Sequence, residues 1–299
     1  MDHFISCDWG TSSFRIRLIQ LSGLQVVARL ENSKFGFGKL NMSTTEKMQL
    51  FRESIAALCK QQQIVEVLSC IISGMASSSI GIRELAYGRL PMSLSAFDIP
   101  YEQLDNNIYL VSGVAAADDV MRGEEVQILG AAQAMSNQSA LAILPGTHSK
   151  HAMLEEGQLK SFKTYLSGEL FSMLHQYSIL KHSLPGVPEE NTDLLAFENG
   201  LEASQRELLH ELFAIRARQL LQGKSPAYNQ HFLSGLLIGT ELRSLAHLSS
   251  PDVLLIADGA LAEVYQSALG FLYPKIAVHL FSTEQATILG HNQLLKTLK

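Results

Sequence analysis

The chain opens with an apolar strand, an acidic residue, a turn rich in glycine and hydroxyls, and a second strand: Phe4-Ile5-Ser6-Cys7-Asp8-Trp9-Gly10-Thr11-Ser12-Ser13-Phe14-Arg15-Ile16-Arg17-Leu18-Ile19. This order predicts a β-hairpin whose tip presents backbone N–H groups and hydroxyls to a phosphate. Gly10 permits close approach to the backbone. Asp8 would hold Mg²⁺ there, although an aspartate beside a turn also caps nearby N–H groups.

Two later segments repeat parts of this pattern. An apolar run enters Leu144–Lys150, where Gly146–His148 predicts a second phosphate-binding turn, with an ordinary hairpin turn as the alternative. A third apolar run enters Ala257–Ala260. Two Gly-Thr turns, each after an apolar strand, favour phosphate binding. The three segments together indicate ATP-dependent phosphoryl transfer.

The composition and two missing motifs exclude several classes of protein. The sequence has no G-x-x-x-x-G-K-[ST], which excludes a P-loop protein, and no G-x-G-x-x-G after a strand, which argues against a dinucleotide-binding fold. The net charge is −6 and no basic run occurs, so neither nucleic acid nor an anionic membrane is expected as a partner. A local cationic pocket for a small anion is compatible with this charge.

We expect a cytoplasmic protein, because the sequence shows no targeting signal and its few cysteines form no motif. The sequence has no apolar run of about 18 residues, the length that predicts a membrane span, and no signal peptide at its start. Its three cysteines, Cys7, Cys59 and Cys70, have no C-x-x-C spacing. We therefore expect reduced thiols rather than a disulfide framework or a zinc site.

The order of apolar runs predicts an α/β protein of two domains hinged around a cleft. Strands are expected at Phe4–Cys7, Phe14–Leu21, Val26–Arg29, Val67–Ile72, Ile108–Val111, Leu141–Leu144, His151–Leu154, Leu159–Tyr165, Val253–Ala257 and Ile276–Leu280. Helices are expected after a capping box at Ser43–Glu46, over Gly123–Met135, from Ser167 to Leu180, across most of 190–247, over Leu261–Leu269 and after Ser282. No strong element is predicted for 75–107, and a loop of that length is usually functional.

The segment Arg122–Glu125 stands just before one of these helices. Carboxylates at a helix N-terminus are stabilised by the helix dipole, which is a sufficient explanation for both glutamates. The functional alternative makes one of them the general base that takes a proton from a substrate hydroxyl. His148 and His151 are expected on opposite faces of a hairpin, so they do not predict a metal site.

Six motifs resemble those of the 2-dehydro-3-deoxygalactonokinase family. They occur in the same order over nearly the whole chain: Asp8–Thr11, Ser73–Met75, Arg122–Gly130, Pro145–Lys150, Ser167–Phe171 and Ser234–Gly239. The Pro-Gly-Thr-His-Ser-Lys and Arg-Gly-Glu-Glu motifs are specific, whereas the opening motif is short.

The resemblance implies the sugar kinase/actin/heat-shock chaperone fold: two ribonuclease-H-like domains with ATP in the cleft between them. We expect the first domain over 1–113 and the second over 114–281, with a helix over 282–299 that packs back on the first. The implied reaction transfers the γ-phosphoryl group of ATP to O6 of 2-dehydro-3-deoxy-D-galactonate, a step of galactonate catabolism. A monomer or a homodimer is expected.

The resemblance also implies roles for individual residues. Related sugar kinases carry Gly-Asp where this chain has Gly123-Glu124, so Glu124 is similar to their base and Glu125 is the second choice. Asp8 is the implied Mg²⁺ ligand. Nucleotide contacts are implied for the first loop (Gly10, Thr11, Ser12, Ser13), the second loop (Gly146, Thr147, His148) and the adenosine motif (Gly235, Asp258, Gly259, Ala260).

The substrate side departs from the family pattern at one place. Ile82 stands where the family tends to have an aromatic residue, in a loop expected to face the sugar. Charge makes Arg15 and Arg122 candidates for holding the carboxylate of the acid sugar, with Arg83 as a third. The identity of the sugar is therefore less firmly predicted than kinase chemistry.

Three other functions stay open on the sequence. One is a kinase for another sugar or sugar acid. The second is a non-catalytic ATP-binding switch on the same fold, like actin or the chaperones. The third is a phosphohydrolase, which would release phosphate without an acceptor. A full set of loops, with a carboxylate where a base is needed, favours the kinase over the switch.

Overall fold

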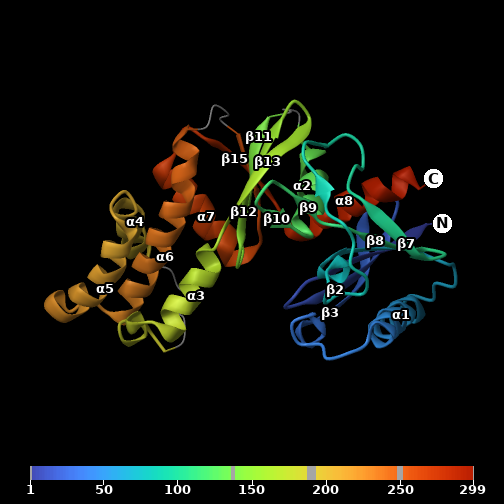
Figure 1. The fold of residues 1–299 in the computed structure, drawn as a ribbon, viewed down its shortest axis with the longest axis horizontal. Helices are drawn as coiled ribbons and strands as arrows, with labels where there is room; N and C mark the ends of the chain where they lie inside the picture. Colours follow the sequence, from blue (N-terminus) through green and yellow to red (C-terminus); the bar gives the residue numbers. More distant parts are fainter. Residues whose placement is uncertain (1, 136–138, 187–192, 248–251, 299) are drawn as a thin grey trace. The chain divides into compact units, whose positions relative to one another are not determined.

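The computed structural model describes residues 2–135, 139–186, 193–247 and 252–298. They form two compact units (Figure 1). Unit 1 comprises Met1–Ser139, Ala152–Phe162 and Phe281–Lys299, and unit 2 comprises Ala140–His151 and Lys163–Leu280. The C-terminal helix belongs to the N-terminal unit, and residues 114–139 belong there too. The boundary between ribonuclease-H-like domains after residue 113 stays a prediction.

The elements follow one another in a mixed α/β order. The first half holds β1 (His3–Trp9), β2 (Phe14–Gln20), β3 (Gln25–Asn32), η1 (Ser33–Phe35), α1 (Thr44–Gln61), β4 (Ser69–Gly74), η2 (Met75–Ser77), β5 (Gly88–Arg89), β6 (Met92–Ser93), β7 (Tyr101–Asp105), β8 (Ile108–Val111), β9 (Val114–Ala115), β10 (Val120–Met121) and α2 (Glu124–Ala132). The second half holds β11 (Ala140–Leu144), β12 (Ser149–Glu155), β13 (Gln158–Tyr165), α3 (Ser167–Tyr177), η3 (Ile179–His182), α4 (Leu194–Ala203), α5 (Leu208–Gln222), α6 (Pro226–Leu242), η4 (Arg243–His247), β14 (Asp252–Ile256), α7 (Gly259–Leu272), β15 (Ala277–Phe281) and α8 (Thr283–Thr297).

Unit 1 is built on a six-stranded sheet in the order β3-β2-β1-β4-β8-β7. The predicted hairpin is present: β1 and β2 pair antiparallel, with Asp8 opposite Arg15 and Trp9 opposite Phe14. β4 runs parallel to β1, and β8 runs parallel to β4. The carboxyl ends of β1 and β4 therefore meet at one edge of the sheet, next to the tip of the hairpin.

Different helices cover the two faces of this sheet. Cys7 of β1 lies in the same buried cluster as Phe51 of α1. Because side chains alternate along a strand, Ser6 points to the other face. There its hydroxyl contacts Nδ1 of His291, on α8, at 2.8 Å. α8 thus packs on the sheet.

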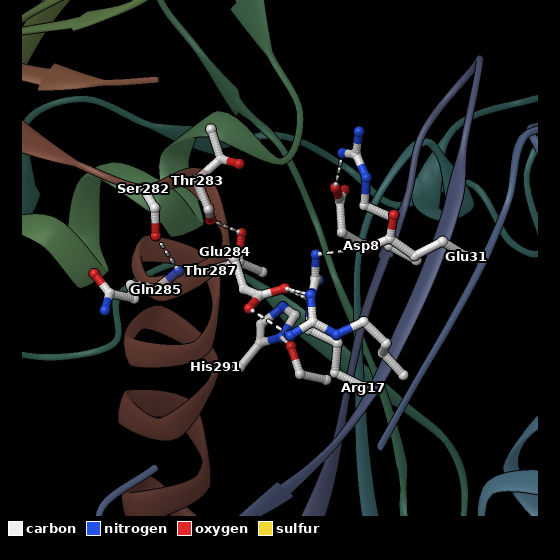
Figure 2. Close-up of polar contacts among 12 residues, drawn as sticks. Asp8, Arg17, Glu31, Ser282, Thr283, Glu284, Gln285, Thr287 and His291 are labelled. Carbon is white, nitrogen blue, oxygen red and sulfur yellow. Dashed lines mark hydrogen bonds and ion pairs between the residues drawn. The ribbon is translucent and has the colours of Figure 1, made fainter. Parts of the chain in front are cut away.

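A buried guanidinium joins α8 to the hairpin. Arg17 of β2 donates from Nε to Glu284 Oε2 at 2.7 Å, and its Nη2 lies 3.7 Å from Glu31 Oε1. Figure 2 shows this guanidinium between the two carboxylates, with His291 beside it. Its buried Nη1 has no hydrogen-bond partner among the described residues.

α8 also packs tightly on α2. A Cβ atom added to Gly130 of α2 would lie 1.9 Å from the carbonyl oxygen of Ala286, and one added to Gly290 would lie 2.2 Å from that of Val126. Two helices approach this closely only where neither carries a side chain at the crossing. The small residues of α2 therefore serve close packing between two helices of unit 1.

Unit 2 combines strands with a group of helices. In its sheet β15, β14 and β11 are neighbours in that order, followed by the start of β12, Ser149–His151, and β11 runs parallel to β14. Among the helices, α4 and α6 cross at Gly200 and Gly235, and a Cβ added to Gly235 would lie 2.0 Å from the carbonyl oxygen of Phe197. Leu233 and Leu236 of α6 pack with Ile215 of α5 in one buried cluster.

The segment 75–107 contains more structure than predicted. Tyr101–Asp105 forms the edge strand β7, and two-residue strands occur at Gly88–Arg89 and Met92–Ser93. Ile82, expected in a loop facing the sugar, is 8% exposed and belongs to the core of unit 1. The position at which Ile82 departs from the family pattern is therefore a core position. Across the described ranges, no helix is both long and apolar enough to cross a membrane.

Candidate functional site

The first Gly-Thr turn is held by its own backbone and by a second segment. Gly10 N–H donates to Ser13 O at 2.9 Å and closes the turn. Phe37 N–H donates to Gly10 O at 3.0 Å. A Cβ on Gly36 would lie 2.5 Å from the backbone of Ser12, so this segment packs directly on the turn. The sequence analysis missed it, and the signal was the pair of glycines Gly36 and Gly38 after the third strand.

Trp9 anchors the same turn in the core. It is fully buried, and its indole Nε1–H donates to Phe35 O at 2.7 Å. Its ring lies 4.6 Å from those of Phe14 and Phe37, centroid to centroid. A rigid aromatic cluster therefore fixes the hairpin while Thr11 and Ser12 stay exposed.

Asp8 and Arg15 form a cross-strand pair beside the turn. Arg15 Nη1 lies 3.3 Å from Asp8 Oδ2, and the Asp8 side chain is 19% exposed. Gly74, with φ +89°, lies against it: a Cβ there would come within 3.3 Å of Asp8 Oδ1. Asp8 is thus accessible at the carboxyl ends of β1 and β4, while Arg15 contacts this carboxylate.

Gly123–Glu125 begins α2 with two carboxylates in different surroundings. Glu124 is half-buried, and its Oε2 accepts from Arg122 N–H at 2.9 Å. Glu125 is fully buried, and both its oxygens accept from Gly123 N–H at 2.8 Å. Burial, with the charge of Glu124 next to it, raises the pKa of Glu125 to about 8.

The three arginines predicted to hold the substrate differ in their partners. Arg15 and Arg83 each form an ion pair with a carboxylate, Asp8 and Glu102 respectively. Arg122 instead donates to Ser77 Oγ at 2.7 Å, and its guanidinium carbon lies 4.3 Å from the centre of the Tyr87 ring. Of the three, Arg122 is the one without a carboxylate ion pair in the part of the chain that the structure describes.

The second Gly-Thr turn meets the start of α3 within unit 2. Glu169 N–H donates to Thr147 O at 3.0 Å, and His148 Nε2 lies 2.5 Å from Glu169 Oε2. A Cβ on Gly168 would lie 2.4 Å from Gly146 O, so only glycine allows this contact. Thr147 and His148 are exposed. The turn therefore lies against a helix N-terminus, where N–H groups and the helix dipole favour anions.

A cavity of about 220 Å³ lies beside this turn. Residues of the turn, of α3, of α6 and of α7 line it: Gly146, Ser167, Gly168, Phe171, Ser234, Leu237, Ile238, Leu261 and Tyr265. The walls are mainly apolar, with hydroxyls at a few points, as in pockets that bind planar organic groups. The motifs Ser167–Phe171 and Ser234–Gly239 had indicated the family without a role for most of these residues.

The predicted adenosine residues lie near this cavity in different ways. Asp258 precedes α7 and is exposed, Gly259 begins the helix with φ +54°, and a Cβ there would meet nothing within 4 Å. Ala260 is exposed too, and the next residue, Leu261, lines the cavity. Gly235 does not line it, because it packs against α4, whereas its neighbour Ser234 does. A place for Gly235 beside the adenine stays a prediction.

The donors present fit a magnesium ion that is held mainly by phosphate. Within the described ranges, no group of three or more His, Cys, Asp or Glu residues could hold a metal ion. Mg²⁺ in kinases keeps several waters and binds one or two carboxylates together with substrate phosphates. One accessible carboxylate, Asp8, matches that need. His148 and His151 contact Glu169 and Glu241 instead.

Comparisons with known proteins agree with this chemistry. The family model described as 2-keto-3-deoxy-galactonokinase matches residues 8–294. The Rhizobium meliloti (strain 1021) protein named Probable 2-dehydro-3-deoxygalactonokinase DgoK1 is 34% identical over 281 residues, which cover 89% of each chain. The Escherichia coli (strain K12) 2-dehydro-3-deoxygalactonokinase is 30% identical over 89% of this chain and 88% of its own.

Solved structures confirm the predicted α/β fold. A Sinorhizobium meliloti protein, described as a proposed 2-dehydro-3-deoxygalactonokinase, is 29% identical and superposes with a TM-score of 0.87 over 99% of both chains. The Acidaminococcus fermentans (R)-2-hydroxyglutaryl-CoA dehydratase component A shares the fold alone, with a TM-score of 0.52 and 13% identity. Because the family model spans nearly all of the sequence and relatives match it along most of their length, the chain belongs to the 2-keto-3-deoxy-galactonokinase family.

Proposed function

We propose that this protein is a cytoplasmic ATP-dependent kinase that phosphorylates O6 of 2-dehydro-3-deoxy-D-galactonate in galactonate catabolism. Membership of a family whose relatives carry this name supports the reaction. The observation that carries the nucleotide part is the cavity of unit 2, which a Gly-Thr turn and the first turns of α3 and α7 border. Helix N-termini and glycine-rich turns are suited to phosphates, and the apolar walls are suited to a base.

Several turns would contribute to nucleotide binding. Gly146–His148 and the start of α3 would take phosphate oxygens, and Asp258–Ala260 would lie at the adenosine. Open space at the Cβ positions of Gly146 and Gly259 supports close approach of a ligand to the backbone there. The turn Gly10–Ser13 would contribute N–H groups and hydroxyls to the transferring phosphate.

Mg²⁺ would lie near Asp8 and would neutralise the charge of the β- and γ-phosphate oxygens. Asp8 is suited to this position because its carboxylate is accessible at the edge of the sheet. Arg15 contacts it and would orient it, which favours this role over the predicted contact with the sugar acid. Arg83 has a carboxylate partner too, so Arg122 is our candidate for the carboxylate of the substrate.

Glu124 would accept the proton of the primary hydroxyl as that hydroxyl attacks the phosphorus atom. Its side chain is half-buried in the first turn of α2, where Arg122 N–H holds it. Glu125 is less suited to act as a base, because burial and a pKa of about 8 keep it protonated at neutral pH. The pair thus resembles other sites in which one carboxylate is accessible and its neighbour is neutral.

The test is ADP production by the purified protein with Mg-ATP. The acceptors would be 2-dehydro-3-deoxy-D-galactonate, its gluconate epimer and ordinary hexoses, with a control that lacks any acceptor. We expect turnover on the galactonate acid. Turnover on another acceptor would keep the kinase and overturn the substrate. ADP release without an acceptor would indicate a hydrolase, and ATP binding without turnover would indicate a switch.

A further inference from the structure

We infer that Glu241, a buried carboxylate on α6, is a positioning residue that sets the affinity of the unit 2 cavity for the nucleotide. This inference rests on the proposed function, since it takes the cavity to be the nucleotide site. Neither the sequence motifs nor the proposed mechanism uses Glu241. Its side chain is 0% exposed, so it acts through the residues it holds.

Glu241 accepts hydrogen bonds from several parts of unit 2. Ser149 Oγ–H donates to Oε1 at 2.7 Å, and His151 Nε2 donates to the same oxygen at 2.9 Å. The Tyr265 hydroxyl donates to Oε2 at 2.9 Å. Ser167 lies near enough to help lower the pKa of this carboxyl too. Both oxygens are therefore satisfied by donors that are far apart in the sequence.

These donors border the proposed nucleotide site. Tyr265 and Ser167 line the cavity itself, on α7 and at the start of α3. Ser149 directly follows the second Gly-Thr turn, Gly146–His148. One carboxylate thus fixes three walls of the same cavity: the end of the turn, the start of α3 and one face of α7.

The chemistry of the cluster requires a carboxylate. Burial alone would raise the pKa of Glu241, yet the donors, led by His151 and followed by Ser167 and Ser149, hold the pKa below its usual value. Burial and the charge of Glu241 raise the pKa of Tyr265, so its hydroxyl stays a donor. Burying a charged side chain costs free energy unless all of its hydrogen bonds are made. An apolar residue would fill the same space without that cost. Holding the walls of a binding site in fixed positions gives this buried carboxylate a role beyond packing.

The variant Glu241→Gln tests the inference with little change in shape. An amide replaces one acceptor oxygen by an NH₂ group, which cannot accept the hydrogen bonds that reach that oxygen: those from Ser149 and His151 at Oε1, or the one from Tyr265 at Oε2. Each lost hydrogen bond leaves a wall of the cavity less constrained. We expect Kd and KM for ATP to rise about tenfold or more, since leaving a buried polar group without its hydrogen bond costs free energy. The kcat at saturating ATP should change less than about twofold, because the groups proposed to act on the transferring phosphate and on the attacking hydroxyl, Gly10–Ser13 and Glu124, belong to unit 1.

Tyr265→Phe supplies a second test and Tyr273→Phe its matched control. Tyr265 lies in α7, and Tyr273 directly follows that helix. The Tyr273 hydroxyl donates to Leu242 O at 2.9 Å, and Tyr273 does not line the cavity. Tyr265→Phe should raise Kd for ATP several-fold, and its effect should be smaller in the Glu241→Gln background, because the two residues share one hydrogen bond. Tyr273→Phe should bind ATP as the wild type does.

Calorimetric titration with ATP and steady-state kinetics would decide. A folded Glu241→Gln protein with wild-type Kd and KM for ATP would overturn the inference, as would equal effects of Tyr265→Phe and Tyr273→Phe. A fall in kcat with KM unchanged would overturn it too. If Glu241→Gln does not fold, the Tyr265→Phe comparison alone decides. A wild-type protein that binds no ATP would overturn the proposed function first, and the inference with it.

Discussion

At the scale of single residues, the contrast between Glu124 and Glu125 decides how the site is interpreted. Adjacent residues in the first turn of a helix point in different directions, so one is half-buried and the other fully buried. From the sequence both were candidates, because spacing says nothing about depth. The structure separates them by burial, and two variants can test that separation.

Glu124→Gln should lower kcat by about 10²–10⁴ and leave ATP affinity nearly intact, because an amide cannot take the proton of the attacking hydroxyl. ADP production at saturating substrates, with ATP binding measured separately, checks this. Glu125→Gln is the matched control: at neutral pH it replaces a protonated carboxyl by a neutral amide of similar shape. Loss of kcat in the control, with kcat kept in Glu124→Gln, would move the base to Glu125.

Glu125 should also shape the pH dependence of stability. Its pKa rises from 4.5 to about 8 in the folded protein. Between these values the folded protein keeps a proton that the unfolded chain has released, so this contribution to stability falls as pH rises through the window. The slope is at most about 1.4 kcal/mol per pH unit.

Urea unfolding of the wild type and of Glu125→Gln from pH 5 to pH 8 would measure this effect. The wild type should lose stability relative to the variant as the pH rises. Other titrating groups, such as the buried His291, are common to both proteins and cancel in the difference. Parallel curves would show that Glu125 titrates in the folded protein as it does in the unfolded chain.

At the scale of elements, glycines mark where backbones approach each other and where a ligand would approach. Gly36 and Gly168 pack on the two Gly-Thr turns, and Gly130 and Gly290 pack between helices. Gly146 has no protein atom near its Cβ position. Packing explains the first four glycines, and it does not explain Gly146.

Gly146→Ala should therefore leave stability unchanged or raise it by up to about 1 kcal/mol, because alanine restricts the unfolded chain. Its affinity for ATP should fall, since the added methyl group lies where a phosphate would approach. Thermal unfolding and ATP titration would measure both. Gly270→Ala, with equally open space on α7, is the control that should gain stability and keep its affinity. An unchanged affinity in Gly146→Ala would remove this turn from the nucleotide site.

Elements with strong local signals were predicted well from the sequence. The hairpin around Gly10–Ser13 is confirmed, and so is the capping box at Ser43, whose hydroxyl accepts from Glu46 N–H. Ser282 caps α8 as expected. β7, Tyr101–Asp105, was missed because it is an edge strand with alternate residues exposed, so its apolar pattern is weak. Short edge strands depend on their neighbours more than on their own residues.

The sequence predicted those parts of the site that depend on local motifs, and it did not predict contacts between distant segments. Both Gly-Thr turns occur where expected, because a turn is fixed by its own residues. The partners of Arg15 and Arg83 depend on the placement of Asp8 and Glu102, which spacing does not give. The cavity needs residues from four separate segments, and for that reason no single motif indicated it.

At the scale of the molecule, the order of the chain differs from the order of the units. Most of unit 1 comes from residues 1–139, and α8, at the other end of the chain, packs on the sheet of that same unit.

 β8, the last strand of that sheet in chain order, ends at Val111, and α8 begins at Thr283. The chain thus builds most of unit 1, forms unit 2, and returns to cover the free face of the first sheet.

The contacts between α8 and the hairpin make this return energetically important. Arg17 is 5% exposed and has its closest carboxylate in Glu284 of α8. Glu284→Gln should destabilise the protein by roughly 2–4 kcal/mol, because it leaves a buried guanidinium with a weaker partner. Denaturant unfolding would measure the loss. Arg52, exposed and paired with Asp105, offers the control: Asp105→Asn should cost less than about 1 kcal/mol. Equal losses would show that burial of Arg17 does not matter.

The return of α8 has a consequence for biosynthesis. The β1–β2 hairpin leaves the ribosome first, while the helix that covers its Ser6 and Arg17 face is made about 260 residues later, at ordinary rates of roughly 5–20 residues per second. During that interval α8 does not yet cover this polar face. By the end of the interval nearly all of unit 2 has been synthesised. A nascent chain stalled before Thr283 should therefore be more sensitive to protease in the hairpin than in unit 2.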